Sequence, residues 1–214
     1  MSNPRKIPFS WLRWIIFLLT CLLFVLSQFY RASVAVITPN LISDLGLDSE
    51  GLSLISAAFF YAFAVMQIPL GIYLDSLGAR VTMTVLSLLA VAGALIFAWG
   101  ESLEALVFGR ILLGVGMACN LMGTLKLITF WFGPRRFATL SAMVISVGTV
   151  GNIAAASPLV YMVQQMGWRG TFTAFAAVNF FLTAVFFIVV RDRPNPDDAA
   201  PGPKASLADL RNAL

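Results

Sequence analysis

The sequence predicts an all-α polytopic membrane protein with six transmembrane helices. Of its 214 residues, 59% are hydrophobic and only 11% are charged, and the mean hydropathy is +0.88. Soluble domains carry about 25% charged residues, so this chain has too few to cover a surface that faces water. In addition, six apolar stretches follow one another, each close to the roughly 20 residues that a helix needs to cross a bilayer.

The six stretches are joined by short polar connections, as expected for antiparallel helices. They cover residues 14–37, 52–74, 81–99, 105–130, 137–163 and 171–190. The first follows basic residues, as in a secretory signal, but it is longer than the apolar region of about 7–15 residues in such signals. We therefore interpret it as a retained helix. We divide the chain into an N-terminal segment (1–13), a six-helix bundle (14–190) and a solvated linker (191–214) that is rich in proline and charge.

The basic residues predict the orientation of the bundle. Cytoplasmic loops carry an excess of Lys and Arg, and here such residues occupy the N-terminal segment and every second loop: Arg5, Lys6, Arg13, Arg80, Arg135, Arg136, Arg191 and Arg193. The alternate loops carry Asp44, Asp48, Glu50, Glu101 and Glu104, with Arg169 as their only base. We expect both termini to be cytoplasmic and the lipid bilayer to be a bacterial inner (plasma) membrane. Because the net charge of +4 is spread between apolar stretches, no nucleic-acid partner is expected.

The residue types that most enzymes need are scarce in this sequence. It has no histidine, so it contains no imidazole metal site and no Ser-His-Asp set. Cys21 and Cys119 lie inside apolar stretches, and we interpret them as small buried side chains rather than a disulfide or metal pair. A phosphate-binding Gly-Lys-Ser/Thr loop is also missing. We therefore predict that the chain is not an enzyme and holds no metal or cofactor.

A polar turn, GIYLDSLGARVT at residues 71–82, separates the second and third stretches. Gly71 would allow a neighbouring helix to approach closely, and Gly78 would allow a left-handed turn residue. Asp75 and Arg80 would face cytoplasmic water or each other. Considered alone, these four residues fit a solvated hairpin as well as a functional motif.

The spacing of these residues, G-x3-D-x2-G-x-R, resembles the signature loop of the major facilitator superfamily. Two more segments resemble motifs of that superfamily: GRILLGVG, with Arg110, Gly114 and Gly116 in the fourth stretch, and GWRGTF at residues 167–172, with RDRP beyond the sixth stretch. The antiporter motif of the fifth helix, G-x3-G-P-x2-G-G, is not met by the segment SVGTVGNIAAASP. The resemblance covers the N-terminal six of the usual twelve helices.

The resemblance implies two six-helix halves around a central cavity that opens alternately to either side of the membrane. A second six-helix half, in the same or another chain, is therefore an expected partner. In the superfamily, the loop between helices two and three belongs to the cytoplasmic gate, where Asp75 and Arg80 would make charge contacts with neighbouring helix ends. The residues expected to serve the conformational change are Gly71, Asp75, Gly78, Arg80, Arg110, Gly114 and Gly116.

Ionisable side chains inside a membrane are costly and point to a functional site. Within the six stretches they are Arg31, Arg110 and Lys126, and no acidic residue lies deep in any stretch. An anionic substrate is the simplest reason for a bundle to tolerate only positive charges. Lys126 lies near the cytoplasmic end, where its amine would extend to the membrane interface. By resemblance, Arg110 has a structural or coupling role more than direct contact with substrate.

Arg31 is the main candidate for substrate binding. It shares one helical face with Ser27, Gln28 and Thr38. The segment QFYRASVAVITPNLISDLGL resembles the first helix of anion:cation symporters and organophosphate:phosphate exchangers, in which an Arg binds carboxylate or phosphate. A guanidinium binds such groups through paired hydrogen bonds. The alternative is an arginine near the outer end whose side chain reaches the lipid headgroups.

Two positions depart from those symporters. They commonly carry an acid just before the first-helix Arg, where this chain has Tyr30, and another acid seven positions after the fourth-helix Arg, where it has Met117. Proton coupling through this half is therefore not expected. Facilitated exchange and a coupling site in a second half both stay open.

Three more polar residues complete the predicted substrate site of Arg31 and Gln28. Tyr61 lies beside a polar stripe on the second stretch, and Asn120 and Asn152 are the polar members of glycine-rich faces on the fourth and fifth stretches. Such faces are more often helix-packing seams than cavity walls.

The sequence thus predicts a secondary active or facilitative transporter of a small solute, an organic anion, by alternating access. A polytopic membrane enzyme is a second possibility, although no catalytic set is present to support it. The third is a half-transporter or a non-transporting membrane module that pairs with a second six-helix unit.

Overall fold

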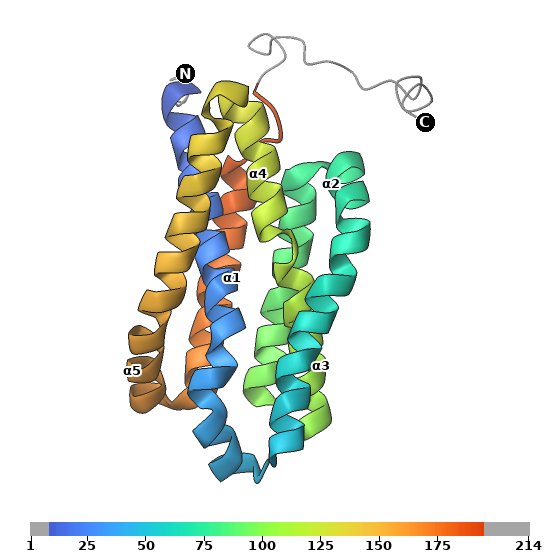
Figure 1. The fold of residues 1–214 in the computed structure, drawn as a ribbon, viewed down its shortest axis with the longest axis vertical. Helices are drawn as coiled ribbons and strands as arrows, with labels where there is room; N and C mark the ends of the chain where they lie inside the picture. Colours follow the sequence, from blue (N-terminus) through green and yellow to red (C-terminus); the bar gives the residue numbers. More distant parts are fainter. Residues whose placement is uncertain (1–8, 195–214) are drawn as a thin grey trace, which may run out of the picture.

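The computed structural model describes residues 9–194, without the side chains of residues 9, 10, 150, 151 and 154–157. Its helices are α1 (Phe9–Leu45), α2 (Ser49–Trp99), α3 (Leu103–Met117), α4 (Cys119–Phe132) and α5 (Pro134–Val189). They run along the long axis of the molecule (Figure 1) and confirm the predicted all-α class. Most of the predicted N-terminal segment and linker lies outside the described residues.

The five helices of the described residues form six rods, because α2 and α5 each reverse at a glycine and α3 and α4 lie end to end. α2 reverses direction at Gly78, with φ 83°, and α5 reverses at Gly167, with φ 71°. A positive φ is open to glycine at little steric cost, so one residue replaces a longer loop at each point, and the left-handed glycine predicted at position 78 is confirmed. α3 and α4 form one rod, because Ala118 between them keeps a helical backbone.

By length and composition, four stretches of the described chain can cross a membrane. They are Trp11–Leu45, Ser49–Trp99, Leu103–Phe132 and Pro158–Val189, and the second contains two of the predicted spans. The helices reach beyond the apolar stretches, since α1 continues to Leu45 through the mixed polar and apolar segment TPNLISD at residues 38–44. Apolar pattern predicts where a helix can be buried in lipid and not where its hydrogen bonding ends.

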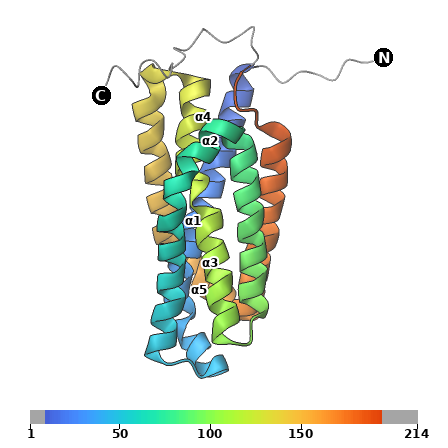
Figure 2. The ribbon, with the colours of Figure 1, turned by 90° about the vertical axis from the view of Figure 1, so that its right-hand side faces the viewer.

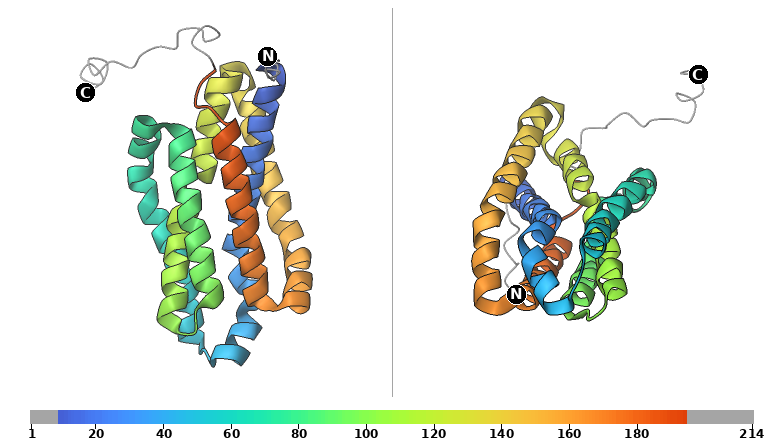
Figure 3. Two further views of the ribbon diagram at one scale, coloured as in Figure 1. Left: turned by 180° about the vertical axis from the view of Figure 1, so that it is seen from behind. Right: turned by 60° about the horizontal axis from the view of Figure 1, so that its bottom comes forward.

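The polar turns gather at two opposite ends of the bundle, which we call the Gly78 end and the Gly167 end. The start of α1, the Gly78 turn and the last turn of α5 lie at the top of Figure 1 and of the left view of Figure 3, and the α1–α2, α2–α3 and Gly167 turns lie at the bottom. At the Gly78 end, the Arg13 guanidinium lies 5.7 Å from the Phe132 ring centre, and Trp131 Nε1 donates to the Arg191 carbonyl over 2.9 Å.

The Gly167 end is held by a hydrogen bond between α1 and α5. Trp168 Nε1 donates to the exposed Asp44 carboxylate, which lies one residue before the end of α1, over 2.8 Å. Two hydrogen bonds hold the pKa of the Asp44 carboxyl below its ordinary value: the larger effect comes from Trp168 and the smaller from the Ser43 hydroxyl. The predicted division of charge between the two ends is kept in the fold.

Small residues let α3 pack closely between the two rods of α2 (Figure 2). A Cβ on Gly114 would collide with the Phe59 carbonyl oxygen in the first rod, and one on Gly116 would lie 2.5 Å from the Leu86 carbonyl oxygen in the second. These glycines therefore form a packing seam, as interpreted for the glycine-rich face of the fourth stretch. Their predicted part in conformational change stays a prediction.

Candidate functional site

Two arginines from different helices lie at one level inside the bundle. Arg110 of α3 donates from Nη1 to the Tyr30 carbonyl oxygen over 2.8 Å, and Arg31 is the next residue of α1. Fourteen residues separate Arg31 from Leu45 at the end of α1, about 21 Å at 1.5 Å per residue. The helix thus continues well past Arg31 toward the Gly167 end, and both interpretations of Arg31 stay predictions.

Arg110 is a fully buried cation held by backbone and aromatic rings. Its side chain is 0% exposed, and its guanidinium carbon lies 4.5 Å from the centre of the Phe59 ring and 6.0 Å from that of Phe97. Its Nε has no hydrogen-bond partner, and no carboxylate of the described chain pairs with it. With its bond to Tyr30, Arg110 ties α3 to the turn of α1 that carries Arg31, which favours the structural role expected for it.

Arg31 is half-buried and has no polar partner among the described residues. No hydrogen bond or ion pair joins it to any residue that the structure describes, and its Nε is buried without a partner. Its guanidinium carbon lies 4.7 Å from the centre of the Phe63 ring and 6.0 Å from that of Phe60, both on α2. Gln28, one turn earlier on α1, has a buried side-chain oxygen that also lacks a partner. The structure thus brings Arg31 and Gln28 together as free polar groups.

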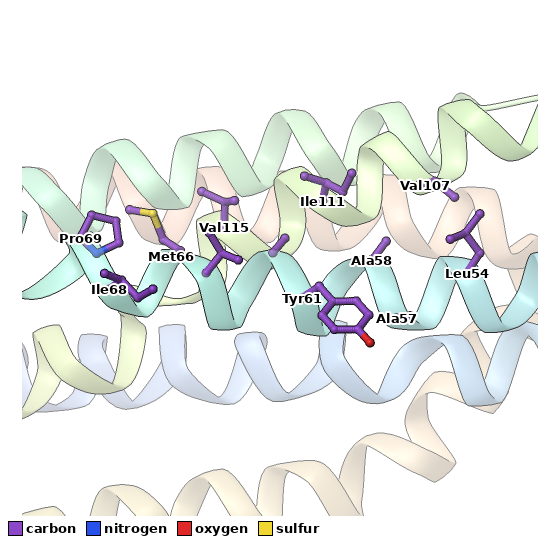
Figure 4. Close-up of a pocket in the computed structure, with 12 residues that line it drawn as sticks. Leu54, Ala57, Ala58, Tyr61, Met66, Ile68, Pro69, Val107, Ile111 and Val115 are labelled. Carbon is purple, nitrogen blue, oxygen red and sulfur yellow. The ribbon is translucent and has the colours of Figure 1, made fainter.

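The other three predicted substrate residues differ from this pair. Asn120 is buried, and its amide donates to the Leu23 carbonyl oxygen of α1 over 3.3 Å, which favours a packing role. Tyr61 is 74% exposed and lines an apolar groove between α2 and α3 (Figure 4). Asn152 is exposed on α5, and no contact joins it to Arg31. Their substrate roles stay predictions.

At the Gly78 end, the predicted gate residues contact two other helices. Asp75 is exposed and forms an ion pair with Lys126 of α4, whose Nζ lies 2.6 Å from Oδ1 and also donates to the Leu74 carbonyl oxygen. The backbone N–H of Arg80 donates to Asp192 Oδ1 over 2.7 Å, and its Nε donates to the Phe187 carbonyl oxygen over 2.9 Å. Charge contacts with neighbouring helix ends are therefore present.

Two expectations for this turn need correction. Asp75 and Arg80 do not pair with each other: Asp75 pairs with Lys126 of α4, and the backbone N–H of Arg80 donates to Asp192 beyond α5. A Cβ built on Gly71 would meet no atom of the described residues within 4 Å, so Gly71 makes no close helix contact in this part of the chain. The Lys126 amine reaches the Gly78 end, where the exposed Asp75 carboxylate and the Leu74 carbonyl oxygen accept its hydrogen bonds.

Sequence reasoning missed three participants: Phe63, the pairing of Lys126, and Asp192. Phe63 belongs to the aromatic run FFYAF at residues 59–63, and aromatic residues in a membrane helix are ordinarily packing or lipid-facing residues. Only the rotation of α2 against α1 decides which of these rings meets Arg31. Asp192 lies in the RDRP segment, which the sequence had already singled out. Its contact with the Gly78 turn follows only from the structure, where a Cβ at position 78 would lie 2.6 Å from the Asp192 carboxylate.

The fold defines an integral membrane protein, a bundle of apolar helical rods with polar turns at both ends. The model of the Major Facilitator Superfamily matches residues 19–213, and the chain belongs to this family. The resemblance predicted from residues 71–82 and from the fourth-helix motif is thereby confirmed.

Curated relatives and solved structures are similar to most of this chain. The chain is 25% identical to the "Probable sulfoacetate transporter SauU" of Cupriavidus necator, over 82% of this chain and 41% of that protein. It is 29% identical to the hexuronate transporter of Escherichia coli strain K12, over 83% of this chain and 41% of that protein. A bacterial homolog of the human lysosomal transporter Spinster, in an inward-facing and unoccupied conformation, matches 97% of this chain and 47% of its own with a TM-score of 0.77 at 18% identity. The chain therefore spans less than half the length of each, and the structural match confirms the fold.

Proposed function

We propose that this chain forms half of a secondary transporter that moves a small organic anion by alternating access, with Arg31 as the anion-binding residue. One observation carries the proposal. Within residues 9–194, the half-buried Arg31 and Gln28 each carry a buried polar atom without a hydrogen-bond partner, and no carboxylate of that range pairs with Arg31 or Arg110. A site that holds only positive charge in a medium of low dielectric is stabilised by an anion.

The names of the relatives support an acid as the substrate class. Sulfoacetate carries a sulfonate and a carboxylate, and a hexuronate carries a carboxylate; these are the solutes in the names of the two relatives above. Each anionic group can accept two parallel hydrogen bonds from one guanidinium. Transport without chemical conversion also agrees with the lack of histidine in the sequence.

The test measures uptake by the full-length gene product, including any second half, in proteoliposomes. Radiolabelled D-glucuronate and sulfoacetate serve as probes, with glucose as a neutral control. Arg31→Ala is expected to lower uptake of the transported acid at least 100-fold, because the guanidinium is the main ligand. Arg136→Ala, at an exposed arginine near the start of α5, is the matched control and should transport normally. Unchanged uptake by Arg31→Ala would remove Arg31 from the site.

We further propose that the Gly78 end faces the cytoplasm of a bacterium and that both termini lie on that side. This end carries most of the basic residues of the described chain, including Arg13, Arg80 and Arg193, in agreement with the excess of basic residues in cytoplasmic loops. In a background without Cys21 and Cys119, Ser76→Cys should react with an impermeant maleimide only in inside-out vesicles, and Ser102→Cys only in right-side-out vesicles. The reverse pattern would invert the topology.

A half-transporter that pairs with a separate six-helix unit is the second candidate, because the chain spans about two fifths of the length of the two curated relatives described above. Coexpression distinguishes the two. Uptake by the full-length gene product alone would favour both halves in one polypeptide, whereas uptake only on coexpression with a separate six-helix polypeptide would favour the half-transporter.

A further inference from the structure

The buried Arg110 and the half-buried Arg31 are joined by a pair of stacked rings on α2. The guanidinium of Arg31 lies over Phe63, at 4.7 Å, and that of Arg110 lies over Phe59, at 4.5 Å. Phe59 and Phe63 are one helical turn apart, and their rings are stacked, with centres 6.3 Å apart and an interplanar angle of 19°. Arg31, Phe63, Phe59 and Arg110 thus form a ladder of alternating helices, α1–α2–α3, which we call the cation–aromatic ladder.

The ladder gives Arg31 what it lacks elsewhere in the described chain, a partner for its charge. The face of an aromatic ring attracts a cation, and the attraction grows when the pair is removed from water. A guanidinium is planar and uses its edge for hydrogen bonds. It can therefore rest its face on a ring and present its N–H groups to a carboxylate or sulfonate at the same time.

Phe63 is better placed for this role than Phe60. Its ring centre is 4.7 Å from the Arg31 guanidinium carbon, against 6.0 Å for Phe60. Phe63 also packs against the main buried cluster, which includes Phe59, whereas Phe60 is 48% exposed. A ring packed on the core can fix the orientation of a guanidinium better than a ring that is half exposed.

We propose that Phe63 is a positioning residue for the anion site: it holds the face of the Arg31 guanidinium so that the edge stays free for one carboxylate or sulfonate group of the substrate. This proposal rests on the proposed function, since it assumes that Arg31 binds the anion. Phe63 itself touches the arginine and not the acid. Removal of the Phe63 ring therefore leaves the charge of Arg31 in place but no longer fixes the orientation of its guanidinium.

Ring fluorination tests the proposal with little change in shape. Phe63 is replaced by mono-, di- and trifluorophenylalanine in the full-length gene product, and the Kd for D-glucuronate and for sulfoacetate is measured by equilibrium binding. Each fluorine weakens the attraction of the ring face for a cation, so the Kd of the bound acid should rise stepwise, about 3- to 30-fold in total. Phe29 is the matched control, because its ring packs on Phe175, with centres 5.1 Å apart, and no guanidinium of the described residues lies over it. A flat series at Phe63, or an equal series at Phe29, would overturn the proposal.

A second measurement needs no substrate. The Tm of Arg31→Gln, Phe63→Leu and the double variant is compared with that of the wild type in detergent. Residues in contact give non-additive effects, so the double variant should lose less than the sum of the two single shifts, whereas additive shifts would overturn the ladder. If the wild type binds neither acid, the transport proposal fails, and this cycle still decides whether Phe63 and Arg31 are coupled.

Discussion

Gly71 and Gly78 lie seven positions apart on α2 in opposite steric situations. Gly78 has a φ of 83°, and a Cβ there would lie 2.6 Å from the Asp192 carboxylate, whereas Gly71 is helical with open space around its Cα. Gly78→Ala should therefore lower the free energy of unfolding by about 1–3 kcal/mol. Gly71→Ala should raise it by up to about 1 kcal/mol, as alanine does in helices. Thermal unfolding in detergent measures both, and equal destabilisation by the two changes would show that Gly71 packs against something beyond residues 9–194.

The importance of a single residue could be predicted from the sequence where one energetic cost is large enough to require a reason for the residue. An arginine in a membrane span is costly wherever it points, so Arg31 and Arg110 stood out before any geometry was known. Phe63 could not be found in this way, because aromatic residues are common in membrane helices and their partners depend on helix rotation. Asn120 shows the limit of this argument: a buried amide is also costly, but a bond within the bundle, here to the Leu23 carbonyl, can offset that cost without a substrate.

At the scale of elements, the ion pair between Asp75 and Lys126 joins the end of the first α2 rod to α4. The Asp75 carboxylate is exposed, and exposed pairs contribute about 0–1 kcal/mol to stability, so its value to the fold is small. Its expected value lies in the conformational cycle. Asp75→Asn and Lys126→Gln should each slow uptake several-fold while leaving the Tm and the affinity for the transported acid nearly unchanged.

Charge reversal provides the control for this pair. The double variant Asp75→Lys/Lys126→Asp restores opposite charges between α2 and α4, and it should recover part of the uptake that Asp75→Lys loses. A loss of affinity without a change in maximal rate, measured by KM against kcat for uptake, would place Asp75 in the binding site and contradict the gate assignment.

The six predicted spans follow the same order as the five observed helices, but they differ from them in number and at their ends: α2 and α5 each contain two predicted spans, and the fourth span covers both α3 and α4. Hydropathy located every rod because burial in lipid demands about 20 apolar residues. It could not show that α2 and α5 stay helical up to a single reversing glycine, since backbone hydrogen bonds continue through polar residues. The small-residue seam on α3 was visible as glycine spacing, but the sequence could not show that Gly114 and Gly116 face different rods of α2.

At the scale of the whole molecule, one apolar face of the bundle has no partner within the described residues. The first rod of α2 exposes large side chains along its length, with Tyr61 74%, Val65 66%, Ile68 82% and Ile72 70% exposed. Beside them, α2 and α3 form a groove of about 660 Å³ with almost wholly apolar walls (Figure 4). Lipid can cover such a face, but a second six-helix half is the occupant that the half-length match to the relatives favours.

Two isoleucines with nearly equal exposure separate these occupants. Ile68 lines the α2–α3 groove and is 82% exposed, and Ile188 near the end of α5 is 77% exposed. If helices of a second half pack on the groove, Ile68→Trp should reduce uptake at least tenfold by preventing close contact between the halves, whereas Ile188→Trp should transport like the wild type because lipid yields to a larger side chain. Proteoliposome uptake is measured together with the amount of folded protein in the membrane. Normal uptake by both variants would mean that lipid covers both faces, and a loss at Ile188 alone would move the interface to α5.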